Sequence, residues 1–313
     1  MNFAEPPSIL DPAGPGAAAV EPLWWAMFWI SVLVFLVVLG LIVLSMRRRG
    51  KVGEPVVEDE ARWGNKFIAT SGVIIPWLIL AAVFVASLNV MKSLASEGKK
   101  TSMTVTVDGR MWWWDVRYPG GVRTANEMHI PVGEKIRVLL TASDVIHSFW
   151  VPQLQVKVDM IPGKTNEVWL EADKPGRYRG QCAEYCGIQH ANMIFYVVAE
   201  PRADFNAWLE NESKPAADPT DAALLRGREV FLGNSCFGCH AIRGTPAEAG
   251  FGPDLTHLAS RETLASGMIA NNRENLERFI TQPQEVKPGD TMPPTALGGG
   301  DLTALLDYLE SLT

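Results

Sequence analysis

Cysteine is scarce in this chain, with four among 313 residues, and all four lie in two close pairs. Cys182 and Cys186 form one pair, and Cys236 and Cys239 form the other. Neither spacing is that of a disulfide framework, and both are typical of cofactor attachment. We therefore expect every cysteine to serve a cofactor.

Positive charge is also in short supply, with 28 Lys and Arg against 35 Asp and Glu and a formal net charge of −7. A nucleic-acid-binding protein normally has a basic face, so nucleic acid is not an expected partner. Residues 219–313 carry seven basic and twelve acidic side chains, a net charge of −5. Such a region either attracts a cationic partner or is a solvated acidic surface.

Charged residues are absent from two long windows, 22–46 and 67–91. Both windows consist mainly of Val, Leu, Ile, Phe, Ala and Trp. Because about 20 helical residues span a bilayer core, the windows predict transmembrane helices at 23–46 and 67–92.

The charges around these windows predict their orientation. The tail 1–22 has no Lys or Arg, which is not typical of a signal peptide. Arg47, Arg48, Arg49 and Lys51 directly follow the first window, and positively charged loops stay in the cytoplasm. Loop 47–66 is therefore expected inside, with the tail and the chain after residue 92 outside. The two helices are expected to form a multi-pass hairpin in membrane lipid.

Three further regions follow the second window. Residues 93–200 contain short alternating or β-rich segments between Gly and Pro turns, which predict a small antiparallel β-sandwich. Residues 201–219 hold Pro201, Pro215 and Pro219 and are expected to form a linker. Residues 220–313 have helical periodicity, and we expect helices at 222–232, 273–281 and 301–312.

The C-x-x-C-H pattern of haem attachment occupies residues 236–240. Thioethers from Cys236 and Cys239 would fix the porphyrin covalently as haem c, with His240 beneath the iron. A zinc half-site is the alternative, but it needs two further Cys or His ligands, and only His257 follows.

Two methionines are candidates for the sixth iron ligand. Met292 is followed by Pro293 and Pro294, which would hold it in a rigid loop on the far side of the haem. Met268 follows Ser266 and Gly267 and is expected to serve packing. Met292 is therefore the expected ligand, since a thioether raises the potential of an electron carrier.

A second cluster combines thiolates, imidazoles and a thioether within a short stretch. Its members are His147, Cys182, Cys186, His190 and Met193. Such soft ligands suit copper better than zinc, calcium or iron. A single-copper site needs one cysteine, whereas two cysteines four residues apart can bridge two copper ions. The alternative is a redox-active cysteine pair beside an unrelated histidine.

On these motifs the chain resembles subunit II of haem–copper cytochrome c oxidases, over nearly its whole length. The fused C-x-x-C-H domain makes it similar to the caa3-type branch. Segments 144–152 and 159–163 match further signatures of that family, and 252–255 resembles the proline loop of class I cytochromes c. The implied fold class is multidomain: a two-helix transmembrane hairpin, a cupredoxin-like β-sandwich and an all-α class I cytochrome c domain.

The resemblance also implies site residues. The dinuclear CuA ligands would be His147, Cys182, the Glu184 backbone carbonyl, Cys186, His190 and Met193. The Glu184 carboxylate would also bind Mg²⁺ at the interface with subunit I.

In the family's aromatic run, electrons enter at the position that Trp112 occupies, while Trp113 replaces the usual Tyr. Asp144 either orients the His147 ring or is a solvated turn residue. The family often has a Glu seven residues before the proline of the second helix, where this chain has Ala69 before Pro76. We therefore expect no proton pathway in this subunit.

The function expected from the resemblance is that of an oxidoreductase subunit through which electrons enter a translocating oxidase. They would pass from an external soluble or membrane cytochrome c through haem c and CuA to subunit I, with subunit III as a further partner. The expected location is the bacterial inner membrane, with both cofactor domains on the periplasmic or extracellular side. The alternatives are a CuA-type nitric oxide reductase and a copper-delivery or redox-sensing protein.

Overall fold

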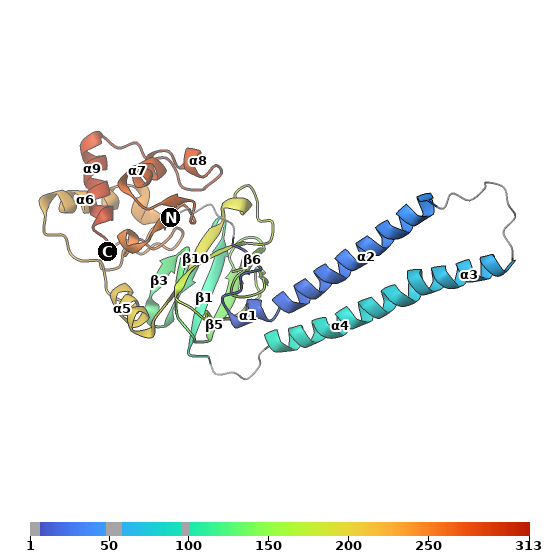
Figure 1. Cartoon of the computed structure of the whole chain (residues 1–313). Coiled ribbons are helices and arrows are strands. Elements are labelled where there is room, and N and C mark those ends of the chain that lie inside the picture. The colour runs from blue at the N-terminus through green and yellow to red at the C-terminus, as the bar shows by residue number, and fades with distance from the viewer. Residues whose placement is uncertain (1–6, 48–57, 96–100) are drawn as a thin grey trace. The chain divides into compact units, whose positions relative to one another are not determined.

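The computed structural model describes residues 7–47, 58–95 and 101–313 (Figure 1). The chain divides into two compact units: residues 18–99, which hold the apolar helices, and residues 100–313 together with the N-terminal 17 residues. The basic segment 48–51, on which the predicted orientation depends, lies outside the described residues.

The membrane unit consists of two long helical stretches. Helix α2, Glu21–Arg47, contacts helix α4, Ile75–Leu94. Helix α3, Glu58–Ala69, continues into α4 through a π-helical turn, Thr70–Ile74. This turn immediately precedes the first turn of α4, where Pro76 lacks the backbone donor of a regular helix. Both stretches are long and apolar enough to cross a membrane.

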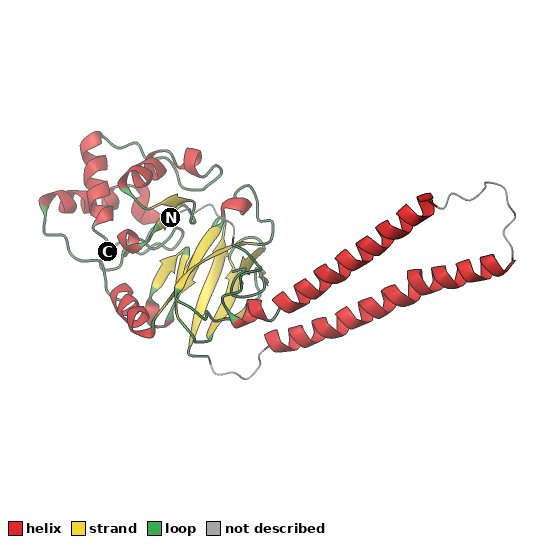
Figure 2. Cartoon of the chain, viewed as in Figure 1, coloured by secondary structure: helices red, strands yellow, loops and turns green. Residues whose placement is uncertain are grey.

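The second unit contains two five-stranded sheets packed face to face (Figure 2). The first sheet has the order β3-β2-β1-β5-β8, with β1 Met103–Arg110, β2 Trp113–Arg117, β3 Arg123–Ala125, β5 Ile136–Ala142 and β8 Asn166–Leu170. The second has the order β4-β10-β9-β6-β7, with β4 Glu127–Pro131, β10 Ile194–Glu200, β9 Gly176–Cys182, β6 His147–Trp150 and β7 Val158–Met160.

The prediction that the sandwich is purely antiparallel is wrong for two strand pairs. β1 runs parallel to β5, and β10 runs parallel to β4. The intervening strand β4 lies in the opposite sheet, so the chain leaves the first sheet after β3 and returns to it at β5. A crossover of this kind joins strands in the same direction, whereas a tight hairpin cannot.

The segment expected to be a linker contains helix α5, Arg202–Glu212. Phe205 is 1% exposed and belongs to the sandwich core, and Trp208 stacks on His129 with 4.1 Å between ring centroids. The prolines of the linker misled the prediction because Pro201 occupies the N-cap, a position that proline tolerates. Burial of one aromatic face then stabilises a helix whose sequence has little apolar periodicity.

The C-terminal domain is helical, and its three predicted helices are confirmed. They are α6 Ala222–Gly233, α7 Arg273–Thr281 and α9 Gly299–Glu310, joined by the short α8, Pro283–Val286, and the small hairpin of β11 Thr263–Leu264 and β12 Ile269–Ala270. The carboxylate of Asp221 caps α6 by accepting a hydrogen bond from the amide of Ala223 at 2.8 Å. This domain has a hydrophobic core of its own, separate from that of the sandwich.

Gly227 allows α6 and α9 to approach closely. A Cβ at this position would lie 2.0 Å from the Ala304 carbonyl oxygen and 2.6 Å from Cβ of Tyr308. We expect Gly227→Ala to destabilise the domain by about 1–3 kcal/mol, since overpacking forces the backbones apart. The measurement is the thermal midpoint of unfolding of the full chain, followed by circular dichroism. Gly233→Ala, in the same helix but with open space around its Cβ, is the control and should keep the midpoint. Equal midpoints for the two variants would contradict the prediction.

Candidate functional site

The cysteine-rich loop joins strands β9 and β10 at one end of the sandwich. Cys182 is the last residue of β9, and Met193 immediately precedes β10. His147 begins β6, which pairs with β9 so that Phe149 lies opposite Cys182. The strand pairing therefore brings a histidine 35 residues distant in sequence to the cysteine loop.

Five side chains and one carbonyl converge there at short distances. The two sulfurs lie 3.7 Å apart, Cys182 Sγ lies 3.9 Å from His147 Nδ1, and Cys186 Sγ lies 3.7 Å from His190 Nδ1. Two weaker donors complete the set. The Glu184 carbonyl oxygen is 3.1 Å from Cys182 Sγ, and Met193 Sδ is 3.8 Å from Cys186 Sγ.

These distances fit ligands that share metal ions. Bonds of about 2.0–2.3 Å place two ligands of one tetrahedral ion roughly 3.5–3.8 Å apart. Each sulfur has one imidazole and one weaker donor beside it, which suits two ions bridged by both sulfurs. The donor set of thiolate, imidazole and thioether is the one that favours copper.

Asp144 holds the His147 ring in place. Its carboxylate lies 2.8 Å from His147 Nε2 and accepts a hydrogen bond from the Met111 amide at 2.6 Å. Of the two roles open to Asp144 in the sequence, the structure shows the orienting one. With Nε2 engaged, Nδ1 faces Cys182, as a ligand must. Burial lowers the pKa of His147, but the hydrogen bonds to Asp144 and Cys182 outweigh it and raise the pKa to about 9.

The pKa values of the two cysteines shift in opposite directions. Pairing with Cys186 lowers the pKa of Cys182 well below that of a free thiol, although burial opposes this. The same pairing, together with burial, raises the pKa of Cys186. A metal ion requires both sulfurs as thiolates, so metal binding must release the protons that they carry.

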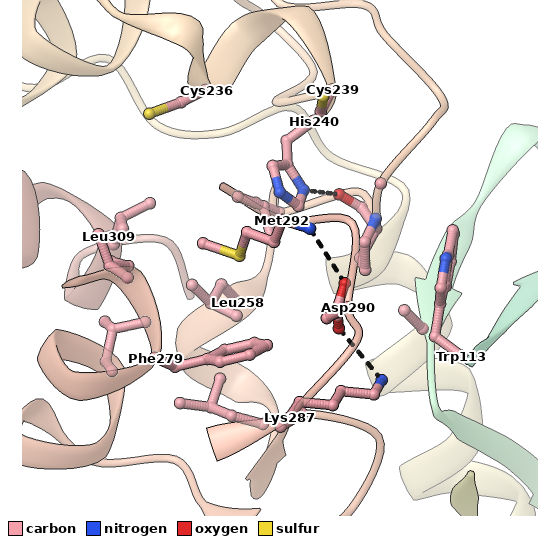
Figure 3. A pocket seen from close by; sticks show the side chains of 18 of the residues that line it. Trp113, Cys236, Cys239, His240, Leu258, Phe279, Lys287, Asp290, Met292 and Leu309 are labelled. Atoms are coloured by element: carbon pink, nitrogen blue, oxygen red, sulfur yellow. Dashed lines mark hydrogen bonds and ion pairs between the residues drawn. The ribbon is translucent and has the colours of Figure 1, made fainter. Parts of the chain in front are cut away.

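A cavity in the helical domain contains the C-x-x-C-H motif and the predicted methionine (Figure 3). Its walls are mainly apolar side chains, and they include Phe231, Leu258, Leu276, Phe279 and Leu309. Cys236, Cys239 and His240 lie on one side, and Met292 lies in the same cavity. An apolar cavity with two thiols, an imidazole and a thioether fits a covalently attached haem.

The proline loop orients His240 within this cavity. Nδ1 of His240 lies 2.7 Å from the carbonyl oxygen of Pro253, which leaves Nε2 free to face the cavity. A Cβ on Gly252 would lie 2.6 Å from the His240 ring, so only glycine fits there. Burial lowers the pKa of His240 and favours the neutral imidazole that a metal requires.

The other candidate side chains lie elsewhere. Met268 is half-buried outside the cavity lining. His257 is 3% exposed, and its ring nitrogens lie 2.7 Å from the Thr313 carbonyl oxygen and 3.1 Å from that of Lys214. With both ring nitrogens at hydrogen-bonding distance from backbone carbonyls, His257 is a structural residue.

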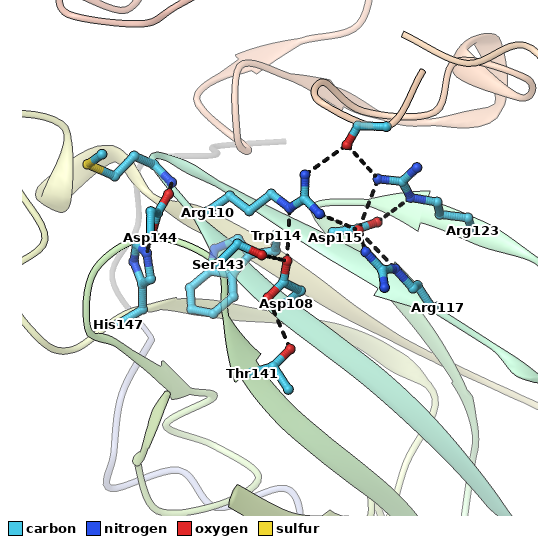
Figure 4. Close-up of polar contacts among 12 residues, drawn as sticks. Asp108, Arg110, Trp114, Asp115, Arg117, Arg123, Thr141, Ser143, Asp144 and His147 are labelled. Carbon is cyan, nitrogen blue, oxygen red and sulfur yellow. Dashed lines mark hydrogen bonds and ion pairs between the residues drawn. The ribbon is translucent and has the colours of Figure 1, made fainter. Parts of the chain in front are cut away.

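Sequence reasoning missed a cluster of charges on the sandwich (Figure 4). Asp115 is fully buried, and its carboxylate accepts hydrogen bonds from Arg117 and Arg123 at 2.6 Å. Arg110 lies 3.7 Å from the same carboxylate. Arg110 and Arg123 also donate to the carbonyl of Gly250, at 2.8 and 3.3 Å, and so tie the sandwich to the helical domain. These Arg and Asp residues have no distinctive spacing in the sequence, so no sequence pattern marks the cluster.

Sequence reasoning also missed Lys287 and Ser266 of the helical domain. Lys287 is 2% exposed and donates to the Trp112 carbonyl at 2.6 Å, and Ser266 donates to the same oxygen at 2.5 Å. Burial lowers the pKa of Lys287 to about 8, with Asp290 opposing the shift. A lysine and a serine among loop residues are ordinary, so no signal in the sequence marks them.

The buried Glu127 of β4 should make the stability of the folded protein depend on pH. It accepts from the amide of Glu262 at 3.1 Å and lies 3.5 Å from Arg177, yet burial dominates and raises its pKa above 4.5. A group with a raised folded-state pKa contributes stability that is complete below the unfolded pKa and is lost as pH rises. The thermal midpoint of the wild type, measured relative to that of Glu127→Gln, should therefore decrease as the pH rises from 4.5 to neutrality. The exposed Glu248→Gln is the control, and a constant difference would contradict the prediction.

Comparisons with known proteins agree with both halves of the site. The family model described as cytochrome c oxidase subunit II, periplasmic domain, matches residues 120–200, and the cytochrome c model matches residues 224–313. Cytochrome c oxidase subunit 2 of Alkalihalophilus pseudofirmus is 38% identical over 97% of this chain and 90% of its own length. That of Bacillus sp. strain PS3 is 35% identical over 85% of this chain and 79% of its own.

One solved structure is similar to part of this chain. It is the periplasmic domain of subunit II of the cytochrome oxidase of Bradyrhizobium japonicum, which is 36% identical. The match covers 36% of this chain and 95% of that domain, with a TM-score of 0.36.

Fold and site together define a membrane-anchored protein with a periplasmic cupredoxin-like sandwich and a cytochrome c domain, of the families that carry copper and haem. The expected fold class is thereby confirmed. The chain belongs to the cytochrome c oxidase subunit II family, whose members are components of a haem–copper oxidoreductase complex, and its fused domain fits the caa3-type branch.

Proposed function

We propose that this chain accepts electrons from an external cytochrome c at a covalent haem c and passes them through dinuclear CuA to subunit I. The observation that carries the proposal is the presence, within one compact unit, of both a six-donor copper-type cluster and a C-x-x-C-H cavity. When bound, these two groups supply one-electron redox chemistry.

For the copper centre we propose the ligands His147, Cys182, the Glu184 carbonyl, Cys186, His190 and Met193. The chain holds these donors on the ends of strands β6 and β9 and on a single loop, so their positions depend on the rigid sandwich beneath them. Asp144 keeps Nδ1 of His147 directed at Cys182. A rigid donor set changes little when the charge of the centre changes, which suits electron transfer.

For the haem centre we propose thioethers at Cys236 and Cys239, with His240 and Met292 as axial ligands. The Pro253 carbonyl keeps the His240 ring oriented, and the apolar walls exclude water. The donor that delivers electrons would dock on the helical domain, whose region 219–313 carries a net charge of −5 and attracts a cationic cytochrome.

We further propose that subunit I covers the copper end of the sandwich, with subunit III as a neighbour of the complex. Val145, Ile146 and Tyr185 lie beside the ligands and are 37%, 45% and 76% exposed. Exposed apolar groups gathered near a site are typical of an interface. The half-buried Glu184 carboxylate would bind Mg²⁺ at that interface.

The two apolar helical stretches would both cross the bacterial inner membrane, so the chain is proposed to pass it twice. The cofactor domains would then lie on the periplasmic side, in agreement with the matched periplasmic family.

The test is a photoreduction of the haem in the purified, fully oxidised complex. We expect the reduced-haem absorption to decay with the same rate constant with which the copper–thiolate absorption disappears. A haem that stays reduced beside oxidised copper, or a preparation without copper–thiolate absorption, would contradict the proposal.

A further inference from the structure

Two adjacent tryptophans of the sandwich face the two proposed cofactor sites. The Trp112 side chain lies on the copper side, where its Nε1 donates to the Cys186 carbonyl at 2.8 Å. Its ring approaches the next residue of the loop so closely that a Cβ on Gly187 would lie 3.0 Å from it. Trp112 is therefore in direct contact with the loop that carries a proposed bridging thiolate.

The Trp113 side chain faces the other way, into the wall of the haem cavity (Figure 3). It is 9% exposed and lines the cavity together with Cys239, His240 and Met292. Trp112 lies in the turn between β1 and β2, whereas Trp113 is the first residue of β2, and the two neighbours reach different sites. Thus Trp113 of the sandwich, together with Ala125 and Asn126, lines one wall of the cavity of the cytochrome domain.

The peptide group between the two rings is held from the cytochrome domain. The Trp112 carbonyl accepts hydrogen bonds from Lys287 Nζ at 2.6 Å and from Ser266 Oγ at 2.5 Å. These two donors also contact each other at 2.8 Å, and Asp290 lies 3.5 Å from the ammonium group. A buried ammonium group is costly unless its partners are well placed, so this contact has a defined geometry.

The Ser266 turn adds a second attachment at the same place. Ala265 and Ser266 both have positive φ angles, 51° and 60°, which are uncommon for residues with a Cβ. The Ser266 carbonyl accepts a hydrogen bond from the Ile194 amide of β10 at 3.2 Å. Strained conformations of this kind persist where the surroundings hold them, here against the sandwich.

We propose that Trp113 connects the haem cavity to Trp112, the electron-entry position that the family resemblance implies, and that Lys287 and Ser266 are positioning residues that hold the pair. This inference rests on the proposed function. The step moves one electron from ferrous haem to the oxidised copper centre, and no bond breaks and no proton moves. Trp112 is 8% exposed, and a Cβ on Gly289 of the cytochrome domain would lie 3.8 Å from its ring, so we expect an external donor to deliver its electron to the haem.

The first test changes the side chain of Trp113 and leaves the backbone contacts between the two domains in place. In the photoreduction experiment, Trp113→Leu should slow haem-to-copper transfer severalfold or more, and Trp113→Phe, which keeps an aromatic ring, should slow it less. The control is Trp169→Leu on β8, which lies away from both sites and should keep the wild-type rate. Hydrogen exchange at the Ile194 amide should stay unchanged in all three variants, which shows that the domains remain docked.

The second test removes the positioning contacts. Lys287→Met should lower the equilibrium constant for docking of the two domains about tenfold, since hydrogen bonds from a charged donor are lost. It should therefore accelerate exchange at Ile194 and slow electron transfer together. Ser266→Ala should act in the same direction but less strongly and is the milder variant if Lys287→Met folds poorly. Lys174→Met, at an exposed lysine, is the control and should change neither measurement.

The outcomes distinguish the two proposals. A wild-type complex in which photoreduced haem never reduces copper would overturn the proposed function. Normal transfer in the wild type with an equal rate in Trp113→Leu would overturn the role of the tryptophan pair alone. Unchanged Ile194 exchange and unchanged rate in both Lys287→Met and Ser266→Ala would overturn the positioning role.

Discussion

Replacing Cys186 with Ser will abolish the copper–thiolate absorption and stop electron transfer beyond the haem. Cys186 Sγ is the central atom of the donor cluster, within 3.8 Å of Cys182 Sγ, His190 Nδ1 and Met193 Sδ. A serine hydroxyl has nearly the same shape but is neither soft nor deprotonated at neutral pH, so it cannot replace a bridging thiolate. Copper content per chain and the visible spectrum measure the loss.

The matched control for this variant is Cys236→Ser, a cysteine of the other pair. It should keep the copper content and the copper–thiolate absorption, because Cys236 lies in the haem cavity. It should lose one of the two thioether bonds while the other still holds the haem covalently, and the unreacted vinyl group is detected as a shifted haem band in the visible spectrum. A Cys186→Ser chain with wild-type copper and absorption would contradict the proposed ligand set.

The second large effect is expected from Met292→Leu. Leucine fills similar space in the cavity but offers no sulfur to the iron, so the haem should stay attached and lose its sixth ligand. We expect the potential to fall on the order of 0.1 V or more, within the roughly 0.8 V range that axial ligands span. A lower potential disfavours reduction of the haem by a donor cytochrome. Redox titration and the spin state in the visible spectrum provide the measurements.

Met268→Leu is the control for the methionine variant. Met268 lies outside the cavity lining, so the spin state and the potential should match those of the wild type. If Met292→Leu kept the low-spin spectrum while Met268→Leu lost it, the assignment of the sixth ligand would be reversed.

The sites could be predicted from sequence because most of their donors are close neighbours in the chain. Cys182, Cys186, His190 and Met193 lie within twelve residues, and Cys236, Cys239 and His240 lie within five. Ligand spacing of this kind is a local property that any fold of the segment must respect. The apolar windows were predictable for a similar reason, since length and composition alone make a helix able to cross a bilayer.

Other features depended on contacts between distant residues. Helix α5 was missed because Phe205 and Trp208 become apolar anchors only when the sandwich is present. The parallel pairing of β1 with β5 was missed because strand direction depends on the path of the chain through the other sheet. Neither contact leaves a periodic pattern in the local sequence.

By itself, the sequence determined the two cofactor types, their ligands as hypotheses and the apolar anchor, because each is encoded by residue chemistry at short spacing. Only the tertiary structure decided how the two sites meet. Lys287 and Trp112 are 175 residues apart, and their contact exists because two separately formed cores pack together. Buried donors and acceptors must find partners wherever the fold places them. The identity of those partners is therefore a property of the packed molecule.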